Sequence, residues 1–306
     1  MSKKRKKIKN ESIVDSDNVL LKPAGKVLAE LILEKEAAFL ASWMHFKTAE
    51  NDLDALHNMR VDLRRLRVWV KLTRDEVKTN QKANKQLKAL AKASNPLRDH
   101  EVMLSWLALA KNQIGGVSAL DNLIEYGKQA YKQQSTQLIF STKQSLAPQP
   151  KQKISVGLEQ WLEKTVEQRI KLMGDAHLAR IEIKYLRYLL EPFSSSVKNS
   201  KELVSWCKEV QEILGDFHDL QVFRSHLPDF ARWVIDHELV EVTLSSGKQS
   251  RAITKVFANA RESIIALSGW QDQELSRQWF KWLDRRDNYL LLLQTLRKNQ
   301  NSTHLV

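Results

Sequence analysis

Apolar residues recur at three- and four-residue spacings along almost the whole chain, which is the periodicity of amphipathic α-helices. Over residues 26–47 this spacing directs Leu28, Leu31, Ile32 and Ala38 toward a core. The same pattern predicts further helices, in chain order, near residues 51–73, 80–94, from 99 onward, 118–144, 156–172, 175–190, 200–214, 219–238, 247–267 and 271–298. The chain is therefore expected to be all-α.

Turn-forming residues set the expected breaks between these helices. Asn95-Pro96 is expected to end the helix before it, because proline cannot donate the hydrogen bond that continues a helix. Pro192 and Gly215 serve as stop signals later in the chain. The segment 145–151 holds two of the six prolines and is the best candidate for a linker. Gly (9) and Pro (6) are scarce overall, which disfavours turn-rich sandwiches, barrels and Gly-rich nucleotide folds.

The chain matches itself at an offset of 120 residues, without a gap, in three separate blocks. In this register His57 falls on His177, Arg60 on Arg180, Arg64 on Lys184, Arg67 on Arg187, Asp99 on Asp219, and Gly127-Lys128-Gln129 on Gly247-Lys248-Gln249. We interpret the match as an internal duplication that gives two similar four-helix bundles related by an approximate two-fold axis. The expected divisions are a basic arm at 1–22, bundles at 23–146 and 147–270, and a docking C-terminal helix at 271–306.

Charge indicates the kind of partner. The 306 residues include 49 Lys+Arg against 36 Asp+Glu, a net charge of +13, which favours an anionic partner. Six of the first ten residues are basic, and this arm is either a disordered solvated segment or a source of non-specific contacts to a polyanion. Without those six charges the surplus is still +7, so the body of the chain is basic in its own right.

Two helices are expected to carry this charge as ordered stripes. At about 100° per residue, the side chains of the first stripe fall within an arc of roughly 80°, with apolar residues on both flanks. The first stripe comprises His57, Arg60, Arg64, Arg67 and Lys71, and the second comprises His177, Arg180, Lys184 and Arg187. Cations repeated every turn, about 5.4 Å apart, suit a flexible chain of phosphates. Each histidine is either structural or an anion contact.

Two further pairs of matched residues are candidates. Asp99 and Asp219 are either helix N-caps or carboxylates that orient Arg60 and Arg180. Lys128 and Lys248 are either an outer ring of cations or, as we slightly favour, ordinary exposed lysines.

The sequence offers little for catalysis or for other compartments. It lacks a Walker A loop, an H-E-x-x-H motif and a G-x-S-x-G motif, and its eight histidines show no metal-ligand spacing. We therefore expect no enzyme activity, no cofactor and no metal. Cys207 is the single cysteine, which excludes an internal disulfide framework and favours a reducing, cytoplasmic compartment. No apolar run approaches 18 residues, so no transmembrane helix and no membrane partner are expected.

Two motifs, each present twice and in the same order, carry a family resemblance. His57-x-x-Arg60-x-x-x-Arg64-Arg65-Leu-Arg67 with Arg98-Asp99-x-x-Val102 resembles the CHAD domain, the conserved histidine α-helical domain. The second copy is similar through His177-x-x-Arg180-x-x-x-Lys184-x-Leu-Arg187 and Leu214-Gly215-Asp216-x-His218-Asp219-x-x-Val222. The first copy departs from the family in having Asn95-Pro96 where Leu-Gly is usual.

The resemblance implies two four-helix bundles with a basic central channel that binds inorganic polyphosphate. It also implies association with polyphosphate granules, as in some bacterial members. The residues implied for binding are the two basic stripes, His57, Arg60, Arg64, Arg67, His177, Arg180, Lys184 and Arg187. We expect a non-catalytic polyphosphate-binding protein, and the alternative is a nucleic-acid-binding protein that uses the same stripes.

Overall fold

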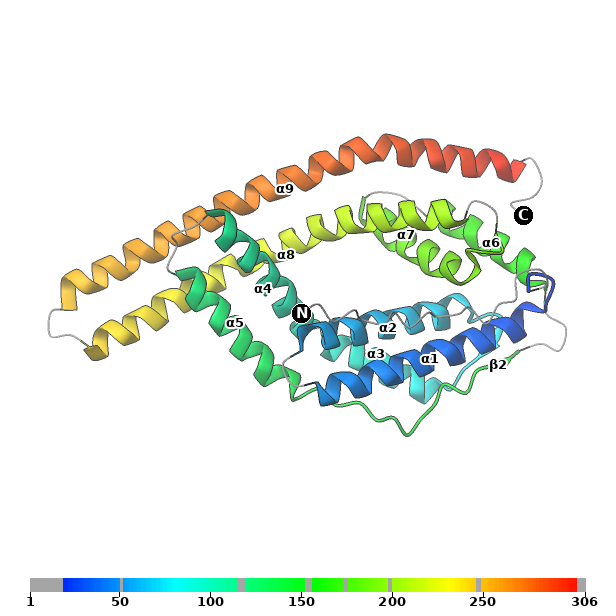
Figure 1. Ribbon diagram of the computed structural model, residues 1–306, viewed down its shortest axis with the longest axis horizontal. Helices are drawn as coiled ribbons and strands as arrows, with labels where there is room; N and C mark the ends of the chain where they lie inside the picture. The colour runs from blue at the N-terminus through cyan, green and yellow to red at the C-terminus, as the bar shows by residue number, and fades with distance from the viewer. Residues whose placement is uncertain are drawn as a thin grey trace, which may run out of the picture.

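The protein is built almost entirely from helices, as predicted. The computed structural model describes residues 19–49, 52–114, 119–151, 156–172, 176–197, 200–245 and 249–301. In chain order (Figure 1) the helices are α1 (Ala24–Thr48), α2 (Leu53–Leu72), α3 (Gln81–Ala93), α4 (Asn95–Ile114), α5 (Ala119–Ser135), α6 (Leu158–Lys171), α7 (Ala176–Leu190), the short 3₁₀ helix η1 (Glu191–Phe193), α8 (Ser200–Ser245) and α9 (Gln249–Asn301). Two short strands, β1 (Val77–Lys78) and β2 (Gln149–Pro150), pair antiparallel. Most of the N-terminal arm, residues 1–18, lies outside the described ranges.

Local sequence signals set the starts of α2 and α3. The Asp52 carboxylate accepts a hydrogen bond from the backbone N–H of Asp54 at 2.9 Å, as an N-cap does. The Asn80 side chain caps α3 in the same way, accepting from the backbone N–H of Lys82 at 2.9 Å. Helix α4 begins at Asn95, earlier than expected, because Pro96 is tolerated in a first turn, where its missing N–H needs no partner. Helix α5 ends at Ser135 and is shorter than expected.

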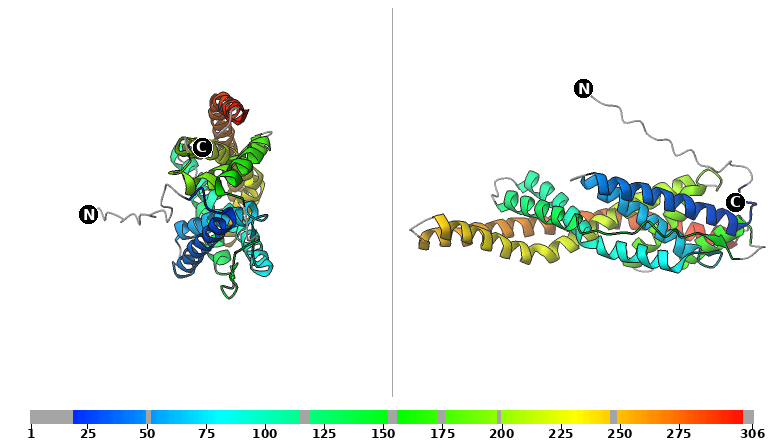
Figure 2. Two further views of the ribbon diagram at one scale, coloured as in Figure 1. Left: turned by 90° about the vertical axis from the view of Figure 1, so that its right-hand side faces the viewer. Right: turned by 90° about the horizontal axis from the view of Figure 1, so that it is seen from below.

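Two of the predicted breaks in the second half are wrong. Helix α8 continues through Gly215, and α9 continues past residues 267–271, whereas α7 does end at Leu190, just before Pro192. A glycine inside a helix costs only about 1 kcal/mol. The buried side chains of Leu214, Leu220 and Phe223 along α8 outweigh that cost. The two helices form a long hairpin whose tip projects beyond the other helices (Figures 1 and 2).

Two hydrophobic clusters organise the helices. One joins α1, α2 and α3 to α6, α7 and the first part of α8, and its largest fully buried side chains include Trp69 and Phe39. The other joins α4 and α5 to the later part of α8 and to α9, around Phe223 and Trp270. Each cluster thus combines residues from both halves of the chain. The internal duplication and the domain divisions remain predictions. Within the described ranges, no helix has both the length and the hydropathy needed to cross a membrane.

The expected linker is an ordered connector that is held to α1. The buried Glu36 carboxylate, 8 % exposed, accepts a hydrogen bond from the backbone N–H of Leu146 at 2.7 Å and from the Ser145 hydroxyl at 2.9 Å. The carbonyl of Leu146 in turn accepts from the backbone N–H of Asn80 at 2.7 Å. These bonds satisfy the backbone groups of the buried Leu146, which would otherwise have no partners.

Removal of the Glu36 carboxylate should destabilise the fold. We expect Glu36→Ala to lower the free energy of unfolding by about 1–3 kcal/mol, because the N–H of Leu146 loses its acceptor inside the protein. Glu36→Gln, which keeps one carbonyl oxygen, should lose less, and Glu30→Ala, at an exposed position of the same helix, should change stability by less than about 0.5 kcal/mol. Urea unfolding of the three variants measures these differences, and equal losses at residues 30 and 36 would contradict the anchoring role.

Candidate functional site

The first basic stripe lies on a helix that is fixed from behind. Leu56, Met59, Leu63 and Leu66 of α2 are almost completely buried and pack into the first hydrophobic cluster. The intervening positions of the helix place Arg60, Arg64 and Arg67 at half-buried sites, and Lys71 at an exposed one. Because the apolar side is anchored, these cations cannot turn away from one another by rotation of the helix.

Cations from three helices converge in front of this face. Lys184 of α7 has its pKa lowered to about 7, first by burial and then by the positive charges of Arg64, Arg180 and Arg98. The pKa of Arg60 is lowered to about 10, again first by burial and then by Arg64 and Arg98. We call this group the central basic cluster. Its members are Arg60, Arg64 and Arg67 of α2, Arg98 of α4, and Arg180 and Lys184 of α7.

Two sets of polar contacts hold the cluster in place. Arg60 donates from Nη1 to both the carbonyl and the hydroxyl of Ser94, and from Nη2 to Asn95 Oδ1 at 3.3 Å. Arg98 forms an ion pair with Asp219 of α8 and a longer one, 3.4 Å, with Asp99. The guanidinium groups are therefore positioned by oxygen acceptors at their edges while most of the positive charge stays uncompensated.

The two predicted carboxylates have different surroundings. Asp99 lies within α4 and Asp219 in the middle of α8, so neither begins a helix and neither acts as an N-cap. Asp219 pairs directly with Arg98, and its charge also favours the protonated forms of Arg180 and Lys184. This contact joins the motif of one half of the chain to the motif of the other, across 121 positions.

The ends of the first stripe differ in character. His57 is exposed, and its Nδ1 lies 3.2 Å from Glu101 Oε1, a hydrogen bond that raises the histidine pKa despite partial burial. At the other end, Lys71 donates to the Tyr185 hydroxyl at 2.9 Å and lies 4.8 Å from the centre of its ring. Arg169 of α6 lies 5.5 Å from the same ring centre and pairs with Glu182 at 3.1 Å.

The second stripe is not brought together as a whole. Arg187 donates to Glu191 at 2.8 Å and to Gln211 at 2.8 Å, and it lies against Tyr188 together with Arg65. These contacts engage Arg187 in a separate cluster with its own carboxylate. The side chain of His177 lies outside the described residues.

The matched lysines are not part of the central basic cluster in the described residues. Lys128 of α5 is 60 % exposed and lies 3.8 Å from Glu125, as expected for an ordinary surface lysine. Lys248 falls in the segment 246–248, outside the described ranges.

Three residues of the site were missing from the predicted set. Arg98 precedes Asp99 in the second motif, so its position beside a matched carboxylate was the available signal. Tyr185 and Arg169 had no such signal. The packing of α2 against α7 brings Tyr185 to Lys71, and the packing of α6 against α7 brings Arg169 to the same ring. Among the described residues, no group of three His, Cys, Asp or Glu side chains is placed to hold a metal ion.

Fold and site together define an all-helical protein with a partly buried cluster of cations. A family model of the CHAD domain matches residues 32–176 and 168–228, more than half of the chain, and the chain therefore belongs to the CHAD domain family. Curated protein sequences contain no match to this chain.

Among the solved structures similar to the chain are a plant CHAD domain and PptA from Streptomyces chartreusis. The crystal structure of the CHAD domain from the plant Ricinus communis aligns with a TM-score of 0.54 and 18 % identity, over 83 % of this chain and 93 % of that chain. PptA from Streptomyces chartreusis aligns with a TM-score of 0.47 and 10 % identity, over 84 % of this chain and 99 % of that chain. The plant structure supports the all-α CHAD fold.

The crowding of cations predicts a stability cost that can be measured. Lys184 has a pKa of about 7 in the folded protein, whereas a lysine in the unfolded chain keeps its ordinary pKa of about 10.4. Between about pH 7 and pH 10 this lysine is therefore protonated only in the unfolded state, and the free energy of unfolding rises with pH. Lys184→Met removes the ammonium group, and we expect it to raise the free energy of unfolding by about 1 kcal/mol at pH 6 and by less at pH 9. Urea unfolding at both pH values tests this, with the exposed Lys88→Met as the matched control. A less stable Lys184→Met protein would contradict the crowding.

Proposed function

We propose that this protein binds inorganic polyphosphate at the central basic cluster and does not act on it as an enzyme. One observation carries the proposal: six cations converge from α2, α4 and α7, and the carboxylates that act on them in the described residues, Asp99, Glu101 and Asp219, are fewer. Such crowding disfavours the free protein and is relieved by a bound polyanion. Membership of the CHAD family supports the same ligand class.

The chemistry of the cluster fits a chain of phosphates. Arginine guanidinium groups donate paired, charge-assisted hydrogen bonds to phosphate oxygens, and partial burial strengthens these bonds relative to water. Arg60 Nε is buried without a hydrogen-bond partner in the structure, so a bound oxygen would satisfy a donor that the protein leaves open. The linear order of Arg60, Arg64 and Arg67 along α2 supplies one contact per turn for successive phosphates.

The alternative, single-stranded nucleic acid, is less favoured by the aromatic residues. Binding of bases relies on free aromatic faces for stacking. The ring of Tyr185 lies against Lys71 and Arg169, and that of Tyr188 against Arg65 and Arg187. These tyrosines already stack on cations of the protein itself, so their rings are not available for stacking on bases, whereas the cations of the site can still bind phosphate.

We further propose that the protein is cytoplasmic and associates with polyphosphate granules.

Long-chain polyphosphate should bind with an affinity that depends on the central basic cluster. We expect Arg64→Ala to weaken binding about tenfold, because Arg64 acts on more members of the cluster than any other cation. Arg74→Ala, at an exposed arginine after α2, is the matched control and should change affinity little. Raising the salt from about 50 to about 200 mM should weaken binding steeply.

Three outcomes would contradict this proposal. The first is undiminished binding after Arg60, Arg64, Arg180 and Lys184 are all changed to alanine. The second is displacement of polyphosphate by RNA or DNA at equal phosphate concentration, which would favour the nucleic-acid alternative. Phosphate release during incubation would contradict the non-catalytic part.

Binding should also weaken as the pH rises. Because the pKa of Lys184 is about 7 in the free protein, its ammonium group is present at pH 6. At pH 8–9 Lys184 is mostly neutral, and ligand binding must be accompanied by uptake of a proton that restores its charge. We expect affinity to fall between about pH 6 and pH 9, by up to about tenfold per pH unit that lies between the free and bound pKa values. His57, with its raised pKa, contributes to the same trend. Titrations at constant ionic strength test this, and Lys184→Arg, which stays charged, should flatten the profile. A profile unchanged in Lys184→Arg would contradict the role of Lys184.

A further inference from the structure

Lys184 is the single amine within the central basic cluster, whose other members are arginines. It lies on α7, is partly buried, and experiences the positive charges of Arg64 from α2, Arg180 from α7 and Arg98 from α4. Its Nζ makes no hydrogen bond or ion pair with any residue that the structure describes. An ammonium group that is partly buried beside like charges, without an acceptor of its own, is disfavoured relative to the neutral amine.

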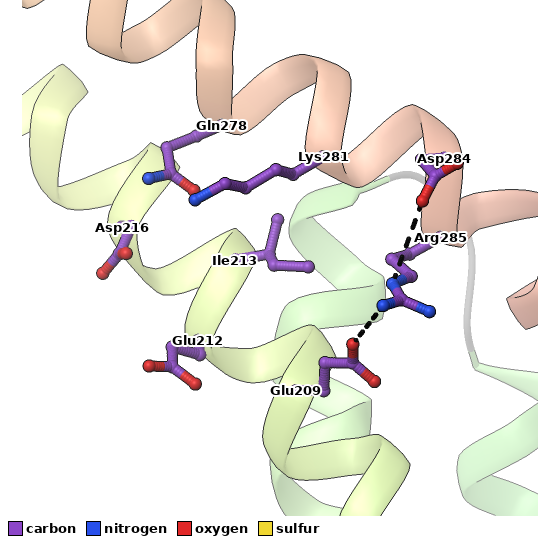
Figure 3. A pocket seen from close by; sticks show the side chains of 8 residues that line it. All are labelled: Glu209, Glu212, Ile213, Asp216, Gln278, Lys281, Asp284 and Arg285. Atoms are coloured by element: carbon purple, nitrogen blue, oxygen red, sulfur yellow. Dashed lines mark ion pairs between the residues drawn. The ribbon is translucent and has the colours of Figure 1, made fainter.

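The neighbouring carboxylates do not reverse this effect. Asp219 of α8 favours the charged form of Lys184, but it is engaged in the ion pair with Arg98. Glu212 and Asp216, which precede Asp219 on α8, line a separate cleft against α9 (Figure 3). Burial, followed by the positive neighbours, lowers the pKa of Lys184 to about 7, so most of this amine is neutral at pH 8.

A neutral amine surrounded by guanidinium groups combines two chemical functions. Lysines become effective nucleophiles when burial or a neighbouring cation keeps them unprotonated. The surrounding arginines donate charge-assisted hydrogen bonds to phosphate oxygens, so they can hold a small phosphorylated molecule beside Nζ. The same donors stabilise the negative charge that develops on a departing phosphate. The cluster thus places a nucleophile next to a site for a phosphate leaving group.

We propose that Lys184 is a site of covalent acylation by acyl phosphates. The lone pair of Nζ attacks the carbonyl carbon of the acyl phosphate and forms an N–C bond. The bond between that carbon and the phosphate oxygen breaks, inorganic phosphate leaves with the electron pair, and the proton of the amine passes to water. The resulting amide is neutral at every pH, so the cluster loses one cation. This reaction does not require that the chain bind polyphosphate.

Incubation of the full chain with acetyl phosphate at pH 8, without polyphosphate, tests the proposal. Peptide mass spectrometry measures the rate of acetylation at each lysine. We expect Lys184 to react at least about tenfold faster than the exposed Lys88 of α3, because an ordinary lysine is almost fully protonated at pH 8. The rate at Lys184 should also level off above about pH 8, which a lysine with the ordinary pKa of about 10.4 does not do.

A variant and a second reagent test the recognition of phosphate. Arg64→Gln should slow the reaction of Lys184 with acetyl phosphate about fivefold or more, because one donor to the phosphate is lost. Arg74→Gln, at an exposed arginine, is the matched control and should react like the unchanged protein. With the N-hydroxysuccinimide ester of acetic acid, which lacks phosphate, the ratio of the Lys184 rate to the Lys88 rate should be smaller. Circular dichroism checks that both variants fold.

Three outcomes overturn the proposal. They are equal rates at Lys184 and Lys88, the same Lys184 rate in Arg64→Gln and Arg74→Gln, or an unchanged ratio of the two lysine rates with the phosphate-free ester. None of these measurements contains polyphosphate. A failure of polyphosphate binding would therefore leave the acylation rates as they are, and the two proposals can fail independently.

Discussion

The site depends on one physical constraint, which is the holding of like charges close together where water only partly screens them. Repulsion and burial disfavour the charged forms of Arg60, Arg180 and Lys184, as their lowered pKa values show. The hydrophobic side of α2 supplies the opposing free energy, because Leu56, Met59, Leu63 and Leu66 remain buried only when the helix presents its cations forward. The buried side of α2 thus stabilises the fold, and the opposite side of the same helix places the cations.

The long helix α8 links this site to the rest of the molecule. Its first part packs into one hydrophobic cluster and its later part into the other, with Asp219 between them in contact with Arg98 of α4. An interruption at Gly215 would separate the two clusters and move Asp219 relative to α7. The continuity of α8 therefore fixes the position of the only carboxylate that the structure pairs with Arg98 from another helix among the described residues.

The carboxylates of α8 have two different surroundings that lie about one helical turn apart. Asp219 faces cations, whereas Asp216 and Glu212 face a cleft closed by α9. Burial of Gln271, Glu274 and Gln278 on α9 makes this helix pair more polar than an ordinary hydrophobic contact. Gln271 donates from its amide to the Leu220 carbonyl at 3.2 Å and Glu274 pairs with Arg277, so part of this polar strip is satisfied within the protein.

The sequence by itself determined the helical class and the stripe on α2, because each depends on residues within a few positions of one another. The motifs also sufficed to indicate the CHAD family. Only the tertiary structure decided that α8 and α9 are continuous, because packing against distant helices outweighs the local signal of Gly215. It likewise decided that Arg98 joins the cluster, that Arg187 is held by Glu191 and Gln211, and that Tyr185 lies between Lys71 and Arg169. Such contacts join residues far apart in the sequence, and no local periodicity encodes them.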